Sequence, residues 1–121
     1  MLHLYGISNC DTVKKAKRWL DERQVAYHWH DFKKSEISAA QLHDWAALCG
    51  WGTLLNRKGT TWKKLPLVEQ AAICDTASAC AAMATYSSLI KRPVLLLADG
   101  DIIVGFSEHL YQQRLGSTVS P

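Results

Sequence analysis

The spacing of apolar residues divides the first third of the chain into two strands around one helix. Residues 2–6 alternate apolar and polar side chains as a short strand does, and residues 25–32 alternate again and are rich in aromatics. Over residues 11–23 the apolar positions recur at helical spacing; they are Val13, Ala16, Trp19 and Leu20. A strand, a helix and a strand joined by short connections predict a parallel pair with a right-handed crossover.

The middle of the chain predicts helices. Ser38 and Gln41 have the spacing of a capping box before an apolar run that Gly50 ends. Residues 51–65 lack a clean period and predict turns and helical fragments. Asp75 or Thr76 can cap an alanine-rich helix that runs to about residue 86. We therefore expect a helical insertion over about 36–88.

The last third predicts a hairpin and a helix. Two apolar runs, 94–98 and 101–105, flank an Asp-Gly pair typical of a two-residue hairpin turn. Ser107 is positioned to cap a final helix that Gly116 closes, which leaves 117–121 as a frayed tail. The whole order predicts a single α/β domain over 1–121 with a thioredoxin-like fold, a four-stranded mixed sheet flanked by helices.

Composition narrows the class of protein. The 121 residues suit one domain, and 14 basic against 11 acidic residues leave a charge of +3, too small an excess to predict a nucleic-acid or membrane partner. With no long apolar run and no leader-like start, we expect a cytoplasmic monomer whose four cysteines are thiols. His28 and His30 share a strand face, but no zinc-type spacing accompanies them, and we expect no metal site.

Cys10 is the candidate nucleophile, because it lies between the first strand and the first helix. Unpaired N–H groups and the helix dipole favour a thiolate there, and such positions lower a thiol pKa from ~8.5 to ~3.5–7.5. The same loop, with Asn9, Asp11 and Thr12, is a candidate site for an oxyanion or a carboxylate-bearing thiol. The Asp11 carboxylate opposes ionisation of the thiol. The alternative is that Cys10 is a small packing residue.

Residues 5–16, YGISNCDTVKKA, resemble the arsenate reductase ArsC family, which includes Spx and YffB relatives, and the YffB-like branch in particular. Segments 30–34, 54–62, 88–94 and 104–106 also agree with that branch. The resemblance implies that Cys10 is the nucleophile, that Arg92 binds an anion and that Pro93 follows a cis peptide. It also implies an anion-binding arginine at Arg57, with Asn56 as the other candidate for that position.

Two departures from the family separate the possible activities. No arginine stands near Gly105, where the third arginine of arsenate reductases is expected, and Val13 occupies the second position of the Cys-x-x-Cys pair of Spx-type regulators. A lone nucleophile needs an outside thiol, and glutathione offers two carboxylates and a sulfur. We therefore expect a glutathione-dependent thiol reductase that forms a mixed disulfide at Cys10.

The expected substrate is a disulfide or an oxyanion, glutaredoxin is a possible partner, and glutathione acts as co-substrate with no bound cofactor. Arsenate reduction proper is one alternative. A non-catalytic Spx-like regulator that binds RNA polymerase is the other. Packing is the expected role of the remaining cysteines, which are Cys49, Cys74 and Cys80.

Overall fold

The computed structural model describes residues 2–34 and 37–119, which form two compact units. The first unit comprises the described residues of 1–31 and 92–121, and the second comprises those of 32–91. The expected insertion over 36–88 falls within the second unit. That the whole chain is one domain stays a prediction, and each unit is described below by itself.

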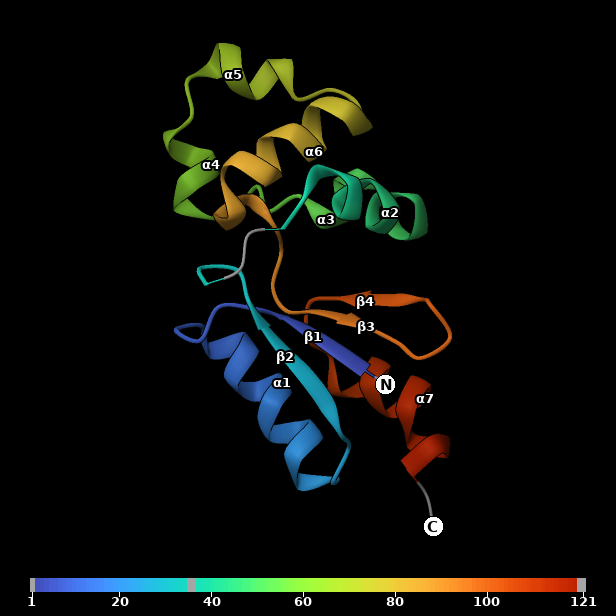
Figure 1. Cartoon of the computed structure of the whole chain (residues 1–121). Coiled ribbons are helices and arrows are strands. Elements are labelled where there is room, and N and C mark those ends of the chain that lie inside the picture. The colour runs from blue at the N-terminus through green and yellow to red at the C-terminus, as the bar shows by residue number, and fades with distance from the viewer. Residues whose placement is uncertain (1, 35–36, 120–121) are drawn as a thin grey trace. The chain divides into compact units, whose positions relative to one another are not determined.

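The first unit is a four-stranded mixed sheet with two helices (Figure 1). Its elements are β1 (Leu2–Gly6), α1 (Asp11–Glu22), β2 (Tyr27–Asp31), β3 (Val94–Leu96), β4 (Ile102–Val104) and α7 (Glu108–Val119). The strand order is β2-β1-β3-β4, in which β1 runs parallel to β2 and antiparallel to β3, and β4 runs antiparallel to β3. This arrangement confirms the predicted thioredoxin-like fold.

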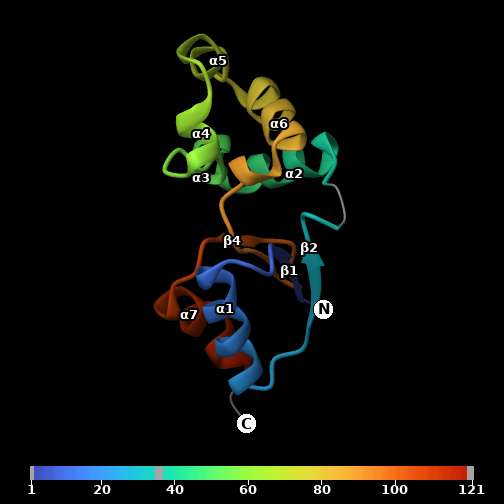
Figure 2. The same ribbon diagram turned by 90° about the vertical axis from the view of Figure 1, so that its left-hand side faces the viewer.

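Helices α1 and α7 cover one face of this sheet, as Figures 1 and 2 both show. The stripe predicted for α1 is the buried one, and Leu4 of β1 faces it with no exposed surface. The ring of Trp19 meets that of the fully buried Tyr111 edge-on, with centroids 5.5 Å apart. Burial of this shared apolar surface is what holds the two helices to the sheet.

A histidine cluster occupies the two strands β1 and β2. His3 Nδ1 lies 2.8 Å from His30 Nε2, and the rings of His3 and His28 are 5.1 Å apart. Partial burial, helped by these two neighbouring imidazoles, lowers the pKa of His30. The predicted shared face of His28 and His30 is thus correct. Within residues 2–34 and 37–119 no three His, Cys, Asp or Glu side chains are grouped to hold a metal ion.

The second unit is helical. Its elements are α2 (Ala39–Cys49), α3 (Trp51–Leu54), α4 (Thr60–Lys64), α5 (Leu67–Ala72), α6 (Thr76–Thr85) and the 3₁₀ helix η1 (Ser87–Leu89). The predicted caps are correct, because Ser38 Oγ accepts the Gln41 N–H at 3.1 Å and Asp75 forms a capping box with Ser78. Helix α5 is an addition that the sequence did not predict.

The hairpin between β3 and β4 differs from the predicted two-residue turn. The Leu97 N–H donates to the Asp101 carbonyl at 2.7 Å and the Gly100 N–H donates to the Leu97 carbonyl at 3.0 Å, which encloses three residues, 98–100. Gly100 has φ +91°. This is a tight turn followed by a left-handed residue, the geometry of three-residue hairpin loops, so the glycine serves the last loop position and not a two-residue turn.

The last helix is longer than predicted. Ser107 Oγ accepts the Leu110 N–H at 3.2 Å, which confirms the cap, but α7 continues through Gly116 to Val119. A glycine ends a helix where it takes a left-handed conformation just past the last turn, whereas here the helix includes position 116 in its interior. The tail predicted over 117–121 is therefore wrong for 117–119, and residues 120–121 lie outside the described residues. No helix in the described ranges has the length and apolar character to cross a membrane.

Candidate functional site

Cys10 is the N-cap residue of α1. Its backbone is extended, with φ −144° and ψ 122°, and its carbonyl accepts the Lys14 N–H at 2.9 Å. The thiol makes no side-chain capping hydrogen bond and is partly exposed. Cys10 is thus held at the start of a twelve-residue helix, where the first-turn N–H groups have no helical partners, and the residue is partly exposed.

The close fit of α1 against the end of β1 depends on Gly6. A Cβ at this position would lie 2.8 Å from Val13 Cγ2 and 3.4 Å from Trp29 Cη2. Val13 is fully buried, so the residue three after Cys10 packs into the fold and supplies no second thiol. The glycine lets the first turn of α1 rest on the strand, which positions the Cys10 loop.

Arg92 and Pro93 enter β3 at the sheet edge where β1 ends. The peptide between them is cis, as predicted, and Pro93 is buried. Tyr5 pairs with Val94 in the antiparallel register, so the beginning of β3 lies next to the end of β1. The chain position of Cys10, four residues beyond that end, puts the thiol and the cis peptide at the same edge of the sheet.

The other predicted residues of this loop are at the surface. Asn9 precedes the cap residue, and Asp11 and Thr12 begin α1; all three are exposed.

Asp31, the last residue of β2, is a candidate that sequence reasoning missed. It pairs in register with Gly6 and is only 8 % exposed. Its signal in the sequence was a carboxylate at the end of a strand predicted to run parallel to the first strand.

Arg57 belongs to the second unit, in the loop between α3 and α4. Its guanidinium lies 5.5 Å from the ring centroid of Trp51 and 5.8 Å from that of Trp62. The Asn56 N–H donates to the Leu89 carbonyl, and Asn56 Oδ1 accepts the Lys58 N–H at 3.1 Å. The Asn56 side chain therefore closes its own turn, while exposed Arg57 projects over two aromatic rings, a geometry that suits a cation.

Gly105 stands where the third family arginine is expected. It has φ +83°, a conformation that residues with a side chain rarely adopt, and its N–H donates to the Pro93 carbonyl at 2.8 Å. This backbone contact ties the end of β4 to the cis-proline segment. An arginine at position 105 would require a different backbone.

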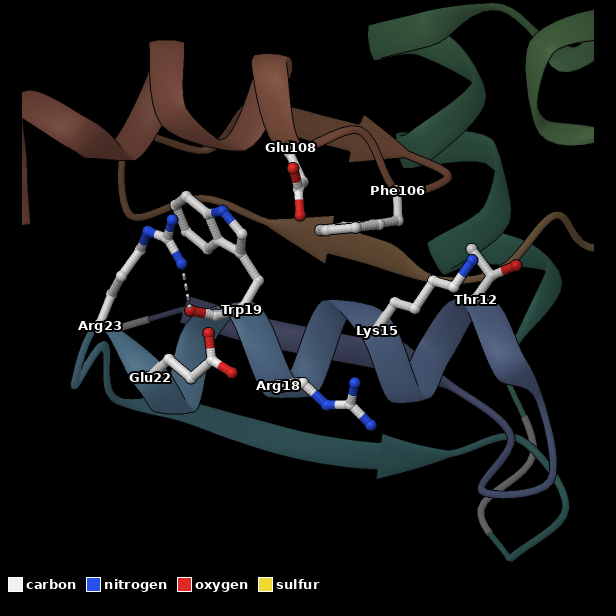
Figure 3. A pocket seen from close by; sticks show the side chains of 8 residues that line it. All are labelled: Thr12, Lys15, Arg18, Trp19, Glu22, Arg23, Phe106 and Glu108. Carbon is white, nitrogen blue, oxygen red and sulfur yellow. Dashed lines mark hydrogen bonds between the residues drawn. The ribbon is translucent and has the colours of Figure 1, made fainter.

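A groove of about 560 Å³ runs along α1 in the first unit (Figure 3). Its lining residues are Thr12, Lys15, Arg18, Trp19, Glu22, Arg23, Phe106 and Glu108. Of these, only Thr12 was predicted as a site residue. The α1 positions recur every three or four residues and so share one side of the helix, a signal present in the sequence. The contribution of Phe106 and Glu108 comes from the tertiary fold.

The other three cysteines differ in their surroundings. Cys49 ends α2 and is partly exposed, with its thiol 3.5 Å from the Gly50 carbonyl. Cys74 is exposed, so the packing role expected for it is wrong, whereas Cys80 in α6 is buried as expected and burial raises the pKa of its thiol. All four cysteines lie within the described residues as thiols. Of the four, Cys10 is the one at a helix N-cap.

Comparisons with known proteins agree with this architecture. The model of the ArsC family matches residues 5–114. An uncharacterised protein of Haemophilus influenzae is 37 % identical over 112 residues, which is 93 % of this chain and 96 % of the relative. The Global transcriptional regulator Spx of Streptococcus pneumoniae is 25 % identical over 111 residues, covering 89 % of this chain and 80 % of that regulator.

Solved structures give the same result. The YffB protein is 47 % identical with a TM-score of 0.89, covering 93 % of this chain and 97 % of that one. An arsenate reductase (ArsC) related protein from Brucella melitensis is 42 % identical with a TM-score of 0.73, and the alignment covers 93 % of this chain and 92 % of that protein. Since the family model spans most of the sequence and these relatives align along nearly all of it, the chain belongs to the ArsC family.

Proposed function

We propose that the chain is a thiol reductase that uses glutathione as co-substrate and Cys10 as its nucleophile. The observation that carries the proposal is the N-cap position of Cys10, partly exposed and without a capping hydrogen bond, at the sheet edge where the cis Arg92-Pro93 peptide begins β3. A thiolate is the reactive form of cysteine, and a helix N-terminus favours it. Membership of an arsenate reductase-related family is consistent with redox chemistry at this residue.

The reaction proceeds by two thiol–disulfide exchanges. The Cys10 thiolate attacks the glutathione sulfur of a substrate–glutathione disulfide, a new sulfur–sulfur bond forms at Cys10, and the substrate leaves as a thiolate that takes a proton from water. A second glutathione, after losing its thiol proton to water, attacks the Cys10-bound glutathione sulfur. Glutathione disulfide leaves and the Cys10 thiolate is restored. The substrate gains a thiol, and the incoming glutathione is oxidised.

The neighbouring residues have separate roles in this proposal. The Arg92 guanidinium binds a glutathione carboxylate, and Pro93 presents backbone next to the mixed disulfide. Asn9 and Thr12, with the N–H groups of the first turn, bind a second carboxylate. Asp11 limits how strongly the thiolate is stabilised. Arg57 belongs to the second unit, where it is held over Trp51 and Trp62, and its predicted role as an anion ligand stays a prediction.

Adduct mapping tests the nucleophile. Reduced protein is incubated with glutathione disulfide, and mass spectrometry of its peptides reports which cysteine carries glutathione. We expect one adduct, at Cys10, which the Cys10→Ser variant lacks. Cys49 is an internal control, because it is also partly exposed but lies at a helix C-terminus, where the dipole disfavours a thiolate. Equal labelling of Cys10 and Cys49 would show that helix position does not activate the thiol and would refute the proposal.

The role of Arg92 is tested by Arg92→Lys, which keeps the charge but loses the forked pair of donors. A charge-assisted contact is worth about 1.5–3 kcal/mol, so we expect the rate of adduct formation to fall by about tenfold or more. Arg23→Lys, at the far end of α1, is the matched control. If both variants react as fast as the parent protein, Arg92 binds no part of glutathione.

Two alternative functions have specific support. Arsenate reduction is favoured by the ArsC-related structural relatives, but the glycine backbone at position 105 removes one anion ligand. An assay of arsenate turnover with glutathione and glutaredoxin tests this activity directly. A regulatory role is favoured by the Spx relatives, and recovery of RNA polymerase subunits by immobilised protein, with no adduct at Cys10, would support it over the reductase.

A further inference from the structure

The groove along α1 has a rigid aromatic wall. Trp19 and Phe106 both meet Tyr111 edge-on, at centroid distances of 5.5 Å and 4.8 Å. Tyr111 is fully buried and Trp19 is 4 % exposed, so packing from behind holds this part of the groove. Phe106 is partly exposed. The groove therefore presents a preformed apolar contact to whatever occupies it, at little cost in side-chain ordering.

The charged residues of the groove favour an acidic occupant. Its cations are Lys15, Arg18 and Arg23, and its carboxylates are Glu22 and Glu108. The Arg23 guanidinium is engaged, because it lies 4.1 Å from the Trp19 ring centroid and donates to the Trp19 carbonyl at 3.4 Å (Figure 3).

Lys15 and Arg18 are placed differently. Across residues 2–34 and 37–119 neither has a carboxylate within 4.0 Å, and both are exposed. Two cations, one helical turn apart, are thus available to a ligand.

One end of the groove is lined by a residue of the first turn of α1, next to the Cys10 loop in the chain. Thr12, which lines it, is two residues after Cys10 in the first turn of α1. The other side of this end is Phe106, which follows the residue whose N–H binds the Pro93 carbonyl. The groove therefore begins at Thr12 and Phe106, which follow the Cys10 loop and the residue bonded to the cis-proline segment, and it leads along α1 toward Arg23.

The length of the groove suits an extended peptide better than a small thiol such as glutathione. Thr12 and Arg23 are eleven residues apart on one helix, which corresponds to about 16 Å at the helical rise of 1.5 Å per residue. An extended chain rises about 3.3 Å per residue, so the groove spans about five residues of peptide. A tripeptide such as glutathione covers little more than half of that length.

We infer that this groove binds an acidic, extended segment of a protein, and that this protein carries the disulfide reduced at Cys10. The second clause rests on the proposed function, whereas the first does not. The segment would place carboxylates near Lys15 and Arg18 and an apolar side chain against Trp19 and Phe106. Substrate choice would then come from about five residues beside the disulfide as well as from glutathione itself.

A binding assay tests the groove without any chemistry at Cys10. A fluorescein-labelled eight-residue peptide with alternating Glu residues, one Phe and no cysteine is titrated with the full chain and followed by anisotropy, beside a peptide in which Lys replaces each Glu. We expect the acidic peptide to bind at least tenfold more tightly, and the Lys15→Glu/Arg18→Glu double variant to weaken it at least tenfold.

Lys17→Glu is the matched control, because Lys17 lies on the same helix but outside the groove, 3.6 Å over the Trp29 ring. We expect it to alter binding of the acidic peptide by less than twofold. Equal affinity for the two peptides, or equal weakening by the Lys17→Glu and Arg18→Glu single variants, would overturn the inference. Thermal melts establish that each variant is folded.

A rate assay tests whether binding in the groove speeds the reaction at Cys10. The same acidic sequence with a glutathionylated cysteine at one end is reduced by the protein and glutathione, and glutathione disulfide serves as the small substrate. We expect the double variant to slow the peptide reaction at least fivefold and to leave adduct formation from glutathione disulfide within twofold. Equal slowing of both would assign the groove to glutathione and overturn the inference.

Failure of the proposed function has a different signature. A protein that never forms a Cys10 adduct refutes the reductase, and the anisotropy titration still decides whether the groove binds an acidic peptide. A protein that forms the adduct but shows no dependence on Lys15 and Arg18 refutes the groove alone.

Discussion

Replacing Gly6 by alanine should destabilise the protein through a specific clash with Val13. The added Cβ would lie 2.8 Å from Val13 Cγ2, whereas carbon atoms in contact are about 3.5–4.0 Å apart. Val13 has no exposed surface, and its branched side chain has one preferred rotamer in a helix. Relief therefore requires α1 to move away from the end of β1 by several tenths of an ångström.

The size of the effect follows from two opposing contributions. Overpacking a buried site costs about 1–3 kcal/mol. Alanine restricts the unfolded chain more than glycine does, and this effect stabilises the folded state by about 0.4–1 kcal/mol. We expect a net loss of about 1–2 kcal/mol in the free energy of unfolding, or a fall in Tm of several degrees for a chain of this length.

A double-mutant cycle measures the clash itself. Free energies of unfolding are obtained by urea titration, followed by circular dichroism, for Gly6→Ala, Val13→Ala and the double variant. Val13→Ala removes the methyl group that the new Cβ meets, so Gly6→Ala should cost nothing in that background. The coupling energy should reach about 1 kcal/mol or more, above the 0.3–0.5 kcal/mol within which independent sites add. Strict additivity would refute the close approach of Gly6 and Val13.

Three further predictions follow from other parts of the fold. Tyr111→Phe should preserve or raise stability, by up to about 1–3 kcal/mol, because the hydroxyl is buried without a hydrogen-bond partner in the described residues and burial raises its pKa; a lower Tm would contradict this. The pKa of His30 is lowered in the folded protein, so near pH 6.5, the ordinary pKa of a histidine, the unfolded chain binds a proton more readily than the folded one. The free energy of unfolding should therefore fall as the pH is lowered from 7.5 to 5.5. His30→Gln should reduce that loss in urea titrations at the two pH values, and an unchanged difference would count against it. Ser38→Ala should cost about 0.5–2 kcal/mol in the free energy of unfolding by removing the cap of α2, and a change within measurement error would show that the cap is not needed.

Local patterns predicted the elements that depend on nearby residues. The stripe of α1, the caps at Ser38, Asp75 and Ser107, and the bounds of β1 all follow from spacing within about ten residues. The predictions of the hairpin loop and of the end of α7 were wrong, because a glycine fits several turn geometries and is also tolerated inside a helix at a modest cost. Which one it adopts depends on the hydrogen bonds around it, as at Gly100.

In the candidate site too, some features follow from local sequence and others from tertiary contacts. The sequence by itself determined that Cys10 would cap the first helix, because a strand pattern ends and a helix pattern begins on either side of it. Only the tertiary structure decided that β3 pairs with β1, which brings the cis peptide at Pro93 to the end of that strand, and that Phe106 closes a groove with Trp19. These neighbours are more than eighty residues apart in the chain. Their contact arises from sheet register and shared burial against Tyr111, which no short stretch of sequence contains.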